Sequence, residues 1–417
     1  MKLEFGFGTS VQNVELPDEN CMGILLPEKV EHQYEGEEAV RQALRHPVGA
    51  GYLKDTVRKG QTVAIVTSDV TRPCPSYAIL PSVLDELYEA GVRKEDITVV
   101  FALGSHRKQT AEEHKKLVGE RVYNEVKCVD SDPDDCISFG RTSHGTPVDI
   151  TRSVAEANFV ICLGNIEYHY FAGFSGGVKA IMPGVSTRSA IQVNHSMMIR
   201  EAAHAGKLEG NPIREDIEEA GRIFGVDYIV NVVLDEHKKI IHAVAGDPVL
   251  AHRQGCAFLE QLYKKPIAER ADIVLVSQGG APKDLNLYQT QKALDNAKHA
   301  VKDGGIIILI GSCKEGLGEK TFGRWISEAR KPSDLTDRVK TAFELGGHKA
   351  AAIAMVLEHA RVFLVSEMDE QLVRACFLEP YSNAQAAFDE AFRILGSHAK
   401  VLAMPYGGST LPVVTEE

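Results

Sequence analysis

The amino-acid sequence predicts an α/β protein of two domains, each with a largely parallel sheet flanked by helices. Three observations lead to this fold class. From residue 60 onward, apolar runs of strand length alternate with longer helical patterns, which is typical of a parallel sheet. The alternation restarts after the polar segment 264–270, which we take as a domain boundary. A chain of 417 residues is also long enough for two domains.

The first domain is expected to cover residues 1–268. Residues 2–26 carry short alternating apolar runs punctuated by Gly and Pro, which predicts a small β element. The strands predicted for the sheet are 62–67, 97–103, 159–163 and 228–234, the last with a hairpin partner at 239–244. The helices predicted between them are 77–90, 109–118, 187–198, 212–224 and 251–263.

The second domain is expected to cover residues 269–417 and to be a second doubly wound, Rossmann-like unit. Its predicted strands are 273–277, 306–310, 362–365 and 400–404. Its predicted helices are 289–301, 384–395 and several between 320 and 360. Ligands of such sheets bind beyond the carboxyl ends of the strands, so the loops that follow the strands are the places to search for a site.

Composition and charge exclude several classes of protein. The formal net charge is -12 without any block of Lys and Arg, which argues against a nucleic-acid or anionic-membrane partner. The eight cysteines lie far apart and no pair has CxxC spacing, as expected for reduced thiols in the cytoplasm. No apolar run approaches the roughly 20 residues that span a bilayer. We therefore predict a cytoplasmic protein.

The loop after strand 62–67 places Asp69, Thr71 and Arg72 beyond a strand end. A planar guanidinium there suits a bidentate grip on a carboxylate or a phosphate. Taken alone, this loop is equally well explained as a surface Asp/Arg pair beside a proline turn.

The loop after strand 97–103 carries His106 directly beyond Gly104 and Ser105. An imidazole with a pKa near 6.5 can take or give a proton at neutral pH, so His106 is a candidate acid or base. A solvated loop histidine is the alternative.

The central stretch follows strand 159–163 and crowds His169, Gly176, Gly177 and Lys179 into one loop. The glycines free the backbone to bring N–H groups against an anion. Apolar neighbours around Lys179 indicate a desolvated amine with a lowered pKa and nucleophilic character. The spacing matches neither a Walker A loop nor a GxGxxG fingerprint. A lysine that grips phosphate without a covalent role is the alternative.

Three further candidates lie on predicted helices. His195, on helix 187–198, can ligate a transition metal through one ring nitrogen, although a lone helix histidine is more often structural. Gln289 and Lys292 are three residues apart on one helix face and can face the first domain across a cleft. A solvated helix start is the alternative for this pair, but a cation there is disfavoured by the helix dipole unless it meets an anion.

Five segments carry a resemblance to a known family. They are SDVTRPCPS, LGSHR, EYHYFAGFSGGVKAIMPG, VNHS and DLNLYQTQKA, which occur in this order between residues 68 and 296. Together they resemble the lactate racemase catalytic-subunit family, whose members use a nickel-pincer nucleotide. The resemblance covers nearly the whole chain.

The resemblance implies a role for each matching residue. Lys179 would bond covalently to the pyridinium-derived thioacid of the cofactor, and His195 would ligate nickel. The cofactor would also be bound by residues of the first and central loops, namely Asp69, Thr71, Gly176 and Gly177. His106 and His169 would be the two acid/base groups. The substrate would be held by Arg72, Gln289 and Lys292.

The implied function is racemisation or epimerisation of a 2-hydroxy acid such as lactate, in a cleft between the domains. Hydride would pass reversibly from the α-carbon to the cofactor through a 2-keto acid. Separate enzymes would make the cofactor, so a preparation can lack it. The sequence leaves open which acid is the substrate, which histidine serves which enantiomer, and whether the chain forms a homo-oligomer.

Two other functions remain alternatives at this point. A nicotinamide-dependent 2-hydroxy acid dehydrogenase would use the same histidines, but it needs a glycine fingerprint that is not found in good form. A non-enzymatic two-domain binder of a small anion would explain Arg72, the glycines and Lys292. It would leave His106, His169 and Lys179 without a purpose.

Overall fold

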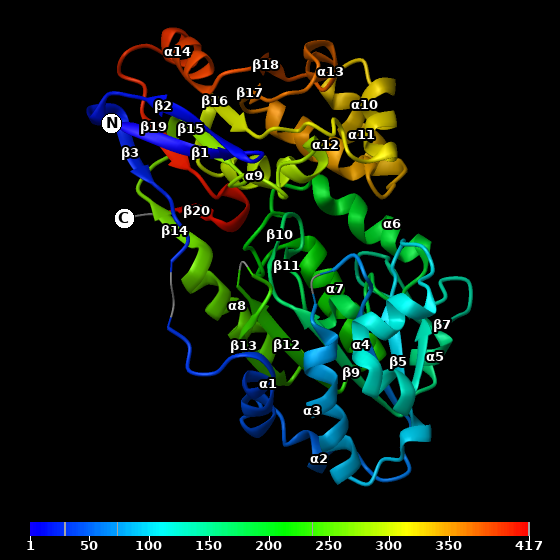
Figure 1. The fold of residues 1–417 in the computed structure, drawn as a ribbon. Helices are drawn as coiled ribbons and strands as arrows, with labels where there is room; N and C mark the ends of the chain where they lie inside the picture. The colour runs from blue at the N-terminus through cyan, green and yellow to red at the C-terminus, as the bar shows by residue number, and fades with distance from the viewer. Residues whose placement is uncertain (29–30, 73, 236, 416–417) are drawn as a thin grey trace. The chain divides into compact units, whose positions relative to one another are not determined.

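The computed structural model describes residues 1–28, 31–72, 74–235 and 237–415, and the chain divides into two compact units (Figure 1). One unit spans Val30–Gln261. The other combines Met1–Lys29 with Leu262–Glu417, so the predicted division at residue 268 differs from these units. The first residues pack with the C-terminal part of the chain because β3 (Cys21–Ile24) pairs in parallel with β19 (Val401–Met404).

The unit Val30–Gln261 is built on a six-stranded sheet in the order β13-β12-β9-β4-β5-β6. All neighbours are parallel except the edge strand β13, which is antiparallel to β12. This confirms the predicted sheet and the predicted hairpin partner. The strands are β4 (Val63–Ser68), β5 (Ile97–Ala102), β6 (Lys127–Asp130), β9 (Phe159–Asn165), β12 (Tyr228–Leu234) and β13 (Ile240–Gly246).

Helices α1, α3 and α4 cover one face of this sheet (Figure 1) and share one apolar core with its strands. Helix α4 begins with a capping box, in which the Thr110 side chain accepts from the backbone N–H of Glu113. The helices of the unit are α1 (Gly36–Arg45), α2 (Leu53–Thr56), α3 (Ser76–Glu89), α4 (Ala111–Glu125), α5 (Arg152–Ala155), α6 (Arg188–Ser196), α7 (Pro212–Phe224) and α8 (Leu250–Tyr263). Two hairpins complete it, β7 (Cys136–Arg141) with β8 (Pro147–Thr151), and β10 (Tyr168–His169) with β11 (Gly173–Phe174).

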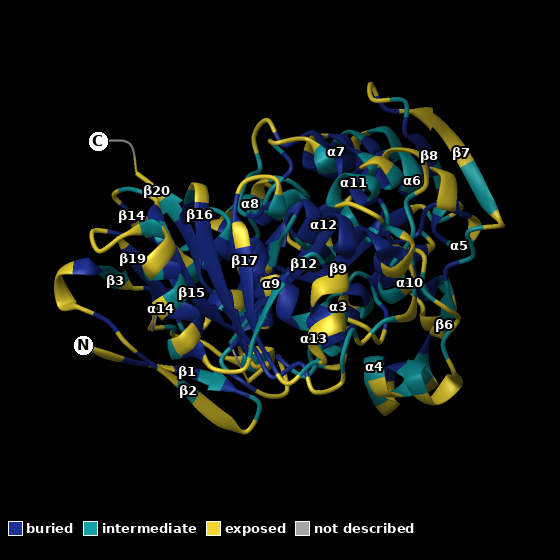
Figure 2. Ribbon diagram, turned by 90° about the horizontal axis from the view of Figure 1, so that it is seen from above, coloured by how far each residue is buried: buried dark blue, intermediate teal, exposed yellow. Residues whose placement is uncertain are grey.

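The second unit has a six-stranded, wholly parallel sheet in the order β18-β17-β16-β15-β19-β3. Its central strands are apolar and buried along most of their length, dark blue in Figure 2. A strand buried on both faces reads as a continuous apolar run, which is why the sequence predicted these strands. Besides β3 and β19, the strands are β15 (Ala271–Ser277), β16 (Val301–Ile310), β17 (Arg361–Val365) and β18 (Glu379–Tyr381).

The hairpin of β1 (Lys2–Phe7) and β2 (Ser10–Glu15) packs with helix α14 over this second sheet. A separate parallel pair joins β14 (Lys264–Ile267) to β20 (Leu411–Val414). The helices of the unit are α9 (Leu287–Ala297), α10 (Lys320–Glu328), α11 (Pro332–Thr341), α12 (Gly347–Leu357), α13 (Glu370–Ala375) and α14 (Ala384–Leu395). Short 3-10 helices occur in both units, at Asp18–Asn20, Lys94–Asp96, Gly177–Ala180, Met197–Ile199 and Gly407–Ser409.

Across the described ranges, no helix combines the length and the apolar character that crossing a membrane would require.

Candidate active site

The candidate site lies in the unit Val30–Gln261, where β9, β4 and β5 are neighbours and end at the same edge of the sheet. Asp69 follows β4 directly, and His106 lies in the loop after β5. Lys179 lies in the loop region after β9. Parallel strands place their carboxyl ends together, so three loops that are distant in sequence meet here.

Asp69 and His106 form a hydrogen-bonded pair at this edge. The Nδ1 atom of His106 lies 2.5 Å from Oδ2 of Asp69, whose side chain is buried. The hydroxyl of Thr71 donates to the other oxygen of Asp69 at 2.7 Å. Burial alone would raise the pKa of Asp69, but the hydrogen bonds from His106 and Thr71 outweigh it and hold the pKa below its usual value. Asp69 is therefore a charged anchor that orients the His106 ring.

His169 lies on β10, with its ring edge-on to Phe171 at 4.5 Å between centroids. The backbone N–H of Ala172 donates to Nδ1 of His169 at 3.3 Å. Burial lowers the pKa of His169 well below 6.5, and the nearby charges of Lys179, Arg72 and His195 lower it further. Both effects favour the neutral form of His169. The same interactions show that the structure brings these four predicted residues together.

The hydrogen bonds at Nδ1 favour different tautomers in the neutral rings of the two histidines. In the neutral His106 ring, Nδ1 holds the proton because it donates to a carboxylate, so Nε2 carries the lone pair. In His169, Nδ1 accepts from a backbone N–H, so Nε2 holds the proton. The neutral rings of the two histidines therefore differ in which nitrogen carries the proton.

Lys179 lies in the 3-10 helix Gly177–Ala180, beyond the end of β9. Burial lowers its pKa from 10.5 to about 7, and the charges of Arg72 and Arg214 add to the shift. The predicted desolvated amine is thus present. At neutral pH a large share of Lys179 is the uncharged, nucleophilic form.

This lowered pKa predicts selective acylation of the apoprotein. We expect Lys179 to react with an amine-selective acylating reagent at a rate that is half-maximal near pH 7. Exposed lysines should instead gain reactivity up to their usual pKa of about 10.4. Peptide mass spectrometry across pH 6 to 10 measures both, with Lys179→Gln to identify the peptide. A Lys179 rate that rises in parallel with those of the exposed lysines would contradict the expectation.

Gly176 and Gly177 have positive φ values of 76° and 60°. A Cβ at Gly176 would lie 2.7 Å from Oδ1 of Asn231, and one at Gly177 would lie 3.0 Å from the His252 ring. The backbone N–H of Gly177 donates to Oδ1 of Asn231 at 2.6 Å. We predicted that this N–H would face an anion, but it is already bonded to Asn231 within the protein. Both glycines permit close packing of the loop onto β12 and α8, and their predicted contact with a cofactor stays a prediction.

Gly173 is the residue paired with His169 in the β10–β11 hairpin. It has φ of 76°, and a Cβ there would lie 2.0 Å from the carbonyl oxygen of Lys207. We expect Gly173→Ala to lower the free energy of unfolding by about 2–5 kcal/mol, from left-handed strain plus overpacking. Gly60→Ala is the matched control, because Gly60 has φ of 87° with open space around it and should lose only about 1–2 kcal/mol. Urea unfolding of both apoproteins, followed by circular dichroism, measures the difference, and equal losses would contradict the packing argument.

His195 is buried on α6, whose N-cap Thr187 accepts from the N–H of Ala190. Its Nδ1 atom lies 2.9 Å from Oδ1 of Asn194, and its ring is edge-on to Phe171. Phe171 also contacts the ring of His169, so one aromatic side chain packs against both imidazoles. An imidazole in this position has the donor chemistry that nickel accepts.

The residues predicted to hold the substrate are divided between the two units. Arg72 is exposed in the loop after β4, and its backbone N–H donates to the carbonyl of Asp69 at 3.1 Å. The next residue, Pro73, lies outside the described residues. Gln289 and Lys292 lie in the first turns of α9 in the other unit, where Asn286 caps the helix by accepting from the N–H of Gln289. Their predicted role in substrate binding stays a prediction.

Sequence reasoning missed Arg214, a fully buried cation on α7. Its Nε donates to the carbonyl of Ala172 at 3.1 Å, and Nη2 donates to the carbonyl of Phe174. Arg214 therefore holds the loop between His169 and Lys179. The signal was present, because residue 214 falls on the apolar face that Ile217 and Gly221 form in helix 212–224.

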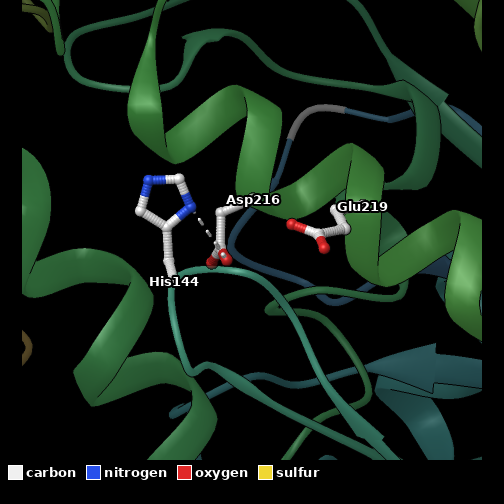
Figure 3. A group of neighbouring side chains, drawn as sticks. All are labelled: His144, Asp216 and Glu219. Atoms are coloured by element: carbon white, nitrogen blue, oxygen red, sulfur yellow. Dashed lines mark ion pairs between the residues drawn. The ribbon is translucent and has the colours of Figure 1, made fainter.

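A second group of side chains has the chemistry to ligate a metal: His144 from the turn between β7 and β8, with Asp216 and Glu219 from α7 (Figure 3). The carboxylates there already accept hydrogen bonds from the turn. Asp216 accepts from the hydroxyls of Thr142 and Thr146, and Glu219 accepts from the N–H and hydroxyl of Ser143. Through these hydrogen bonds, both carboxylates attach the hairpin to α7.

Two family models together match most of the chain. Residues 7–206 match the model of the lactate racemase N-terminal domain, and residues 267–412 match that of the lactate racemase C-terminal domain. The lactate racemase of Thermoanaerobacterium thermosaccharolyticum is 32% identical over 98% of each chain. The lactate racemase of Lactiplantibacillus plantarum is 33% identical over 94% of this chain and 95% of its own.

Solved structures agree with the family models. The lactate racemase apoprotein from T. thermosaccharolyticum superimposes with a TM-score of 0.89 at 33% identity, over 100% of both chains. A Thermotoga maritima protein shares the fold alone, with a TM-score of 0.63 and 20% identity over 92% of this chain and 100% of that chain. With these relatives, the chain is an α/β enzyme of the isomerase class. The chain belongs to the lactate racemase family.

Proposed function

We propose that this protein racemises lactate or a similar 2-hydroxy acid through a 2-keto acid. The observation that supports this best is the grouping of two histidines with a desolvated lysine of lowered pKa at one edge of one sheet. Inverting a carbon centre in both directions requires an acid/base group for each enantiomer. Membership of the lactate racemase family and the names of its relatives point to the same reaction.

The side chains divide the work as follows. Arg72 holds the substrate carboxylate, since a guanidinium matches two carboxylate oxygens. His106 takes the hydroxyl proton of one enantiomer at Nε2, while Asp69 stabilises the imidazolium that forms. His169 is the second acid/base group: its imidazolium form gives a proton to the ketone oxygen as the opposite enantiomer is made, and the ring is left neutral. The hydroxyl proton thus leaves to one histidine and returns from the other.

The residues present fit a nickel-pincer nucleotide. We propose that His195 ligates its nickel, that the neutral amine of Lys179 carries its covalent bond, and that Asp69, Thr71, Gly176 and Gly177 also bind it. When bound, the cofactor supplies the acceptor for the α-hydride. The description of the solved relative as an apoprotein is consistent with a group that is added after folding.

The cellular setting completes the proposal. We propose that separate biosynthetic enzymes supply the cofactor in the cytoplasm and that Gln289 and Lys292 contribute to substrate binding. The acidic net charge of -12 supports a partner that is a small molecule and not a nucleic acid.

The experiment that tests this function measures intact mass, nickel content and racemisation together. The protein is purified from a host with the cofactor's biosynthetic enzymes, beside a known family member as loading control. We expect an added mass on the Lys179 peptide, about one nickel per chain, and racemisation of lactate or of another acid in a 2-hydroxy acid panel.

An unmodified, nickel-free chain from a host that loads the control would overturn the proposal. Two alternatives would then return. Hydride transfer to NAD would identify a dehydrogenase, and ligand binding without turnover would identify a binder of small anions.

A further inference from the structure

A buried chain of hydrogen bonds runs from the hairpin turn of β7 and β8 to His195. The side-chain N–H of Asn194 donates to Oδ2 of Asp216 at 2.7 Å, and Oδ1 of Asn194 lies 2.9 Å from Nδ1 of His195. Asp216 and Asn194 are both fully buried. The hydroxyls of Thr142 and Thr146 hold Asp216 from the other side.

This chain fixes the tautomer of the His195 ring by elimination. A carboxylate only accepts hydrogen bonds, so the Asn194 atom that faces Asp216 is the amide nitrogen. The amide oxygen therefore faces His195, and an oxygen that accepts requires the proton on Nδ1. In the neutral ring the lone pair then lies on Nε2. Orientation of a metal-ligating imidazole by a partner on its other nitrogen is a general device of metal sites.

We propose that Asn194 and Asp216 are positioning residues that hold His195 protonated at Nδ1 and present Nε2 to the metal. The proposal rests on the proposed function, because His195 is a ligand only if the nickel cofactor binds. It also gives Asp216 a purpose beyond anchoring the hairpin. Figure 3 shows the Asp216 carboxylate beside His144 of the hairpin turn, with Glu219 farther along α7.

The first test reads the tautomer directly in the apoprotein, without nickel. A long-range ¹H–¹⁵N correlation spectrum of protein labelled with ¹⁵N-histidine, at a pH where the ring is neutral, distinguishes the two tautomers. His195→Gln assigns the signal. We expect the Nδ1–H pattern for His195 in the wild type. The Nε2–H pattern would overturn the proposal, whether or not the protein is a racemase.

The second test compares variants. Asn194→Leu removes the acceptor, and Asp216→Asn removes the charge that orients the amide. Thr187→Ala is the control, because it weakens the start of α6 without touching His195. We expect the Nδ1–H signal to be lost in Asn194→Leu, reduced in Asp216→Asn and kept in Thr187→Ala.

Nickel retention in the loaded enzyme gives the second readout. Against a chelator, we expect nickel affinity to fall by roughly 10- to 100-fold in Asn194→Leu, and to change little in Thr187→Ala. If Asn194→Leu and Thr187→Ala show the same His195 tautomer and lose nickel equally, the proposal is wrong. If Asn194→Leu does not fold, the His195 tautomer measured in the wild type and in Asp216→Asn still tests the proposal. Absence of nickel from every preparation would count against the proposed function, and the apoprotein tautomer would still decide this inference.

Discussion

Lys179→Ala, expressed with the cofactor's biosynthetic enzymes, is expected to lose the added mass on its peptide and to lose racemase activity by roughly 10³-fold or more. The reason is chemical, because alanine has no amine to form the bond. The loss should not come from misfolding. Burying a lysine disfavours its charged form, so removing Lys179 should stabilise the apoprotein, and more so below pH 7, where the amine is charged, than above it.

The sign of that pH dependence follows from the shifted pKa. The folded state releases the Lys179 proton near pH 7, whereas the unfolded chain holds it up to about pH 10.4. The wild-type protein should therefore gain stability relative to Lys179→Ala as pH rises from 7 to 10. Intact mass, a racemisation assay and urea unfolding at both pH values are the measurements. Lys179→Arg is the control that keeps a cation but cannot be neutral. Full activity in either variant would rule out the covalent role.

His106→Gln and His169→Gln are each expected to slow racemisation by about 10²- to 10⁴-fold in both directions. The two enantiomers have equal free energies, so a variant cannot lose only one direction of the overall reaction. The first half of the reaction can differ, however. Each variant should still convert to the 2-keto acid the enantiomer whose base remains.

Trapping that 2-keto acid with a carbonyl reagent separates the two histidines. Starting from pure enantiomers, we expect one variant to yield trapped keto acid only from D-lactate and the other only from L-lactate. Each variant serves as the control for the other. If both variants yield the same pattern, the two histidines do not act on opposite faces, and the two-base scheme is wrong. Asp69→Asn should show the same trapping pattern as His106→Gln with a smaller loss of rate, because it weakens the hydrogen bond that orients the His106 ring.

The sequence predicted the fold class and most of the elements because the strands of both sheets are short, apolar and buried on both faces. Such strands can be predicted without knowing which strand they pair with, as β9 and β15 show. The position of β3 in the second sheet could not be predicted from the sequence. Cys21–Ile24 is short and half-exposed, and its pairing with β19 joins the two ends of the chain.

The sequence predicted the site residues that directly follow strand ends. It did not predict the features of the site that depend on packing between distant residues. Asp69, His106 and Lys179 were found because parallel strands end together. The tautomers of His106 and His169 depend on contacts that local sequence does not encode. Likewise, the N–H of Gly177 was predicted to face an anion, but Asn231 on β12 takes it. Arg214 was overlooked although a cation on the apolar face of a helix is a visible signal.

The pairing of β3 with β19 has a consequence for synthesis on the ribosome. Residues 21–24 leave the ribosome long before residues 401–404, and at about 5–20 residues per second the delay is roughly 20 to 75 s. During that interval the unit Val30–Gln261 is synthesised and completed, while the hairpin of β1 and β2 and the strand β3 still lack the sheet on which they belong. The first unit to begin synthesis is thus the last to fold.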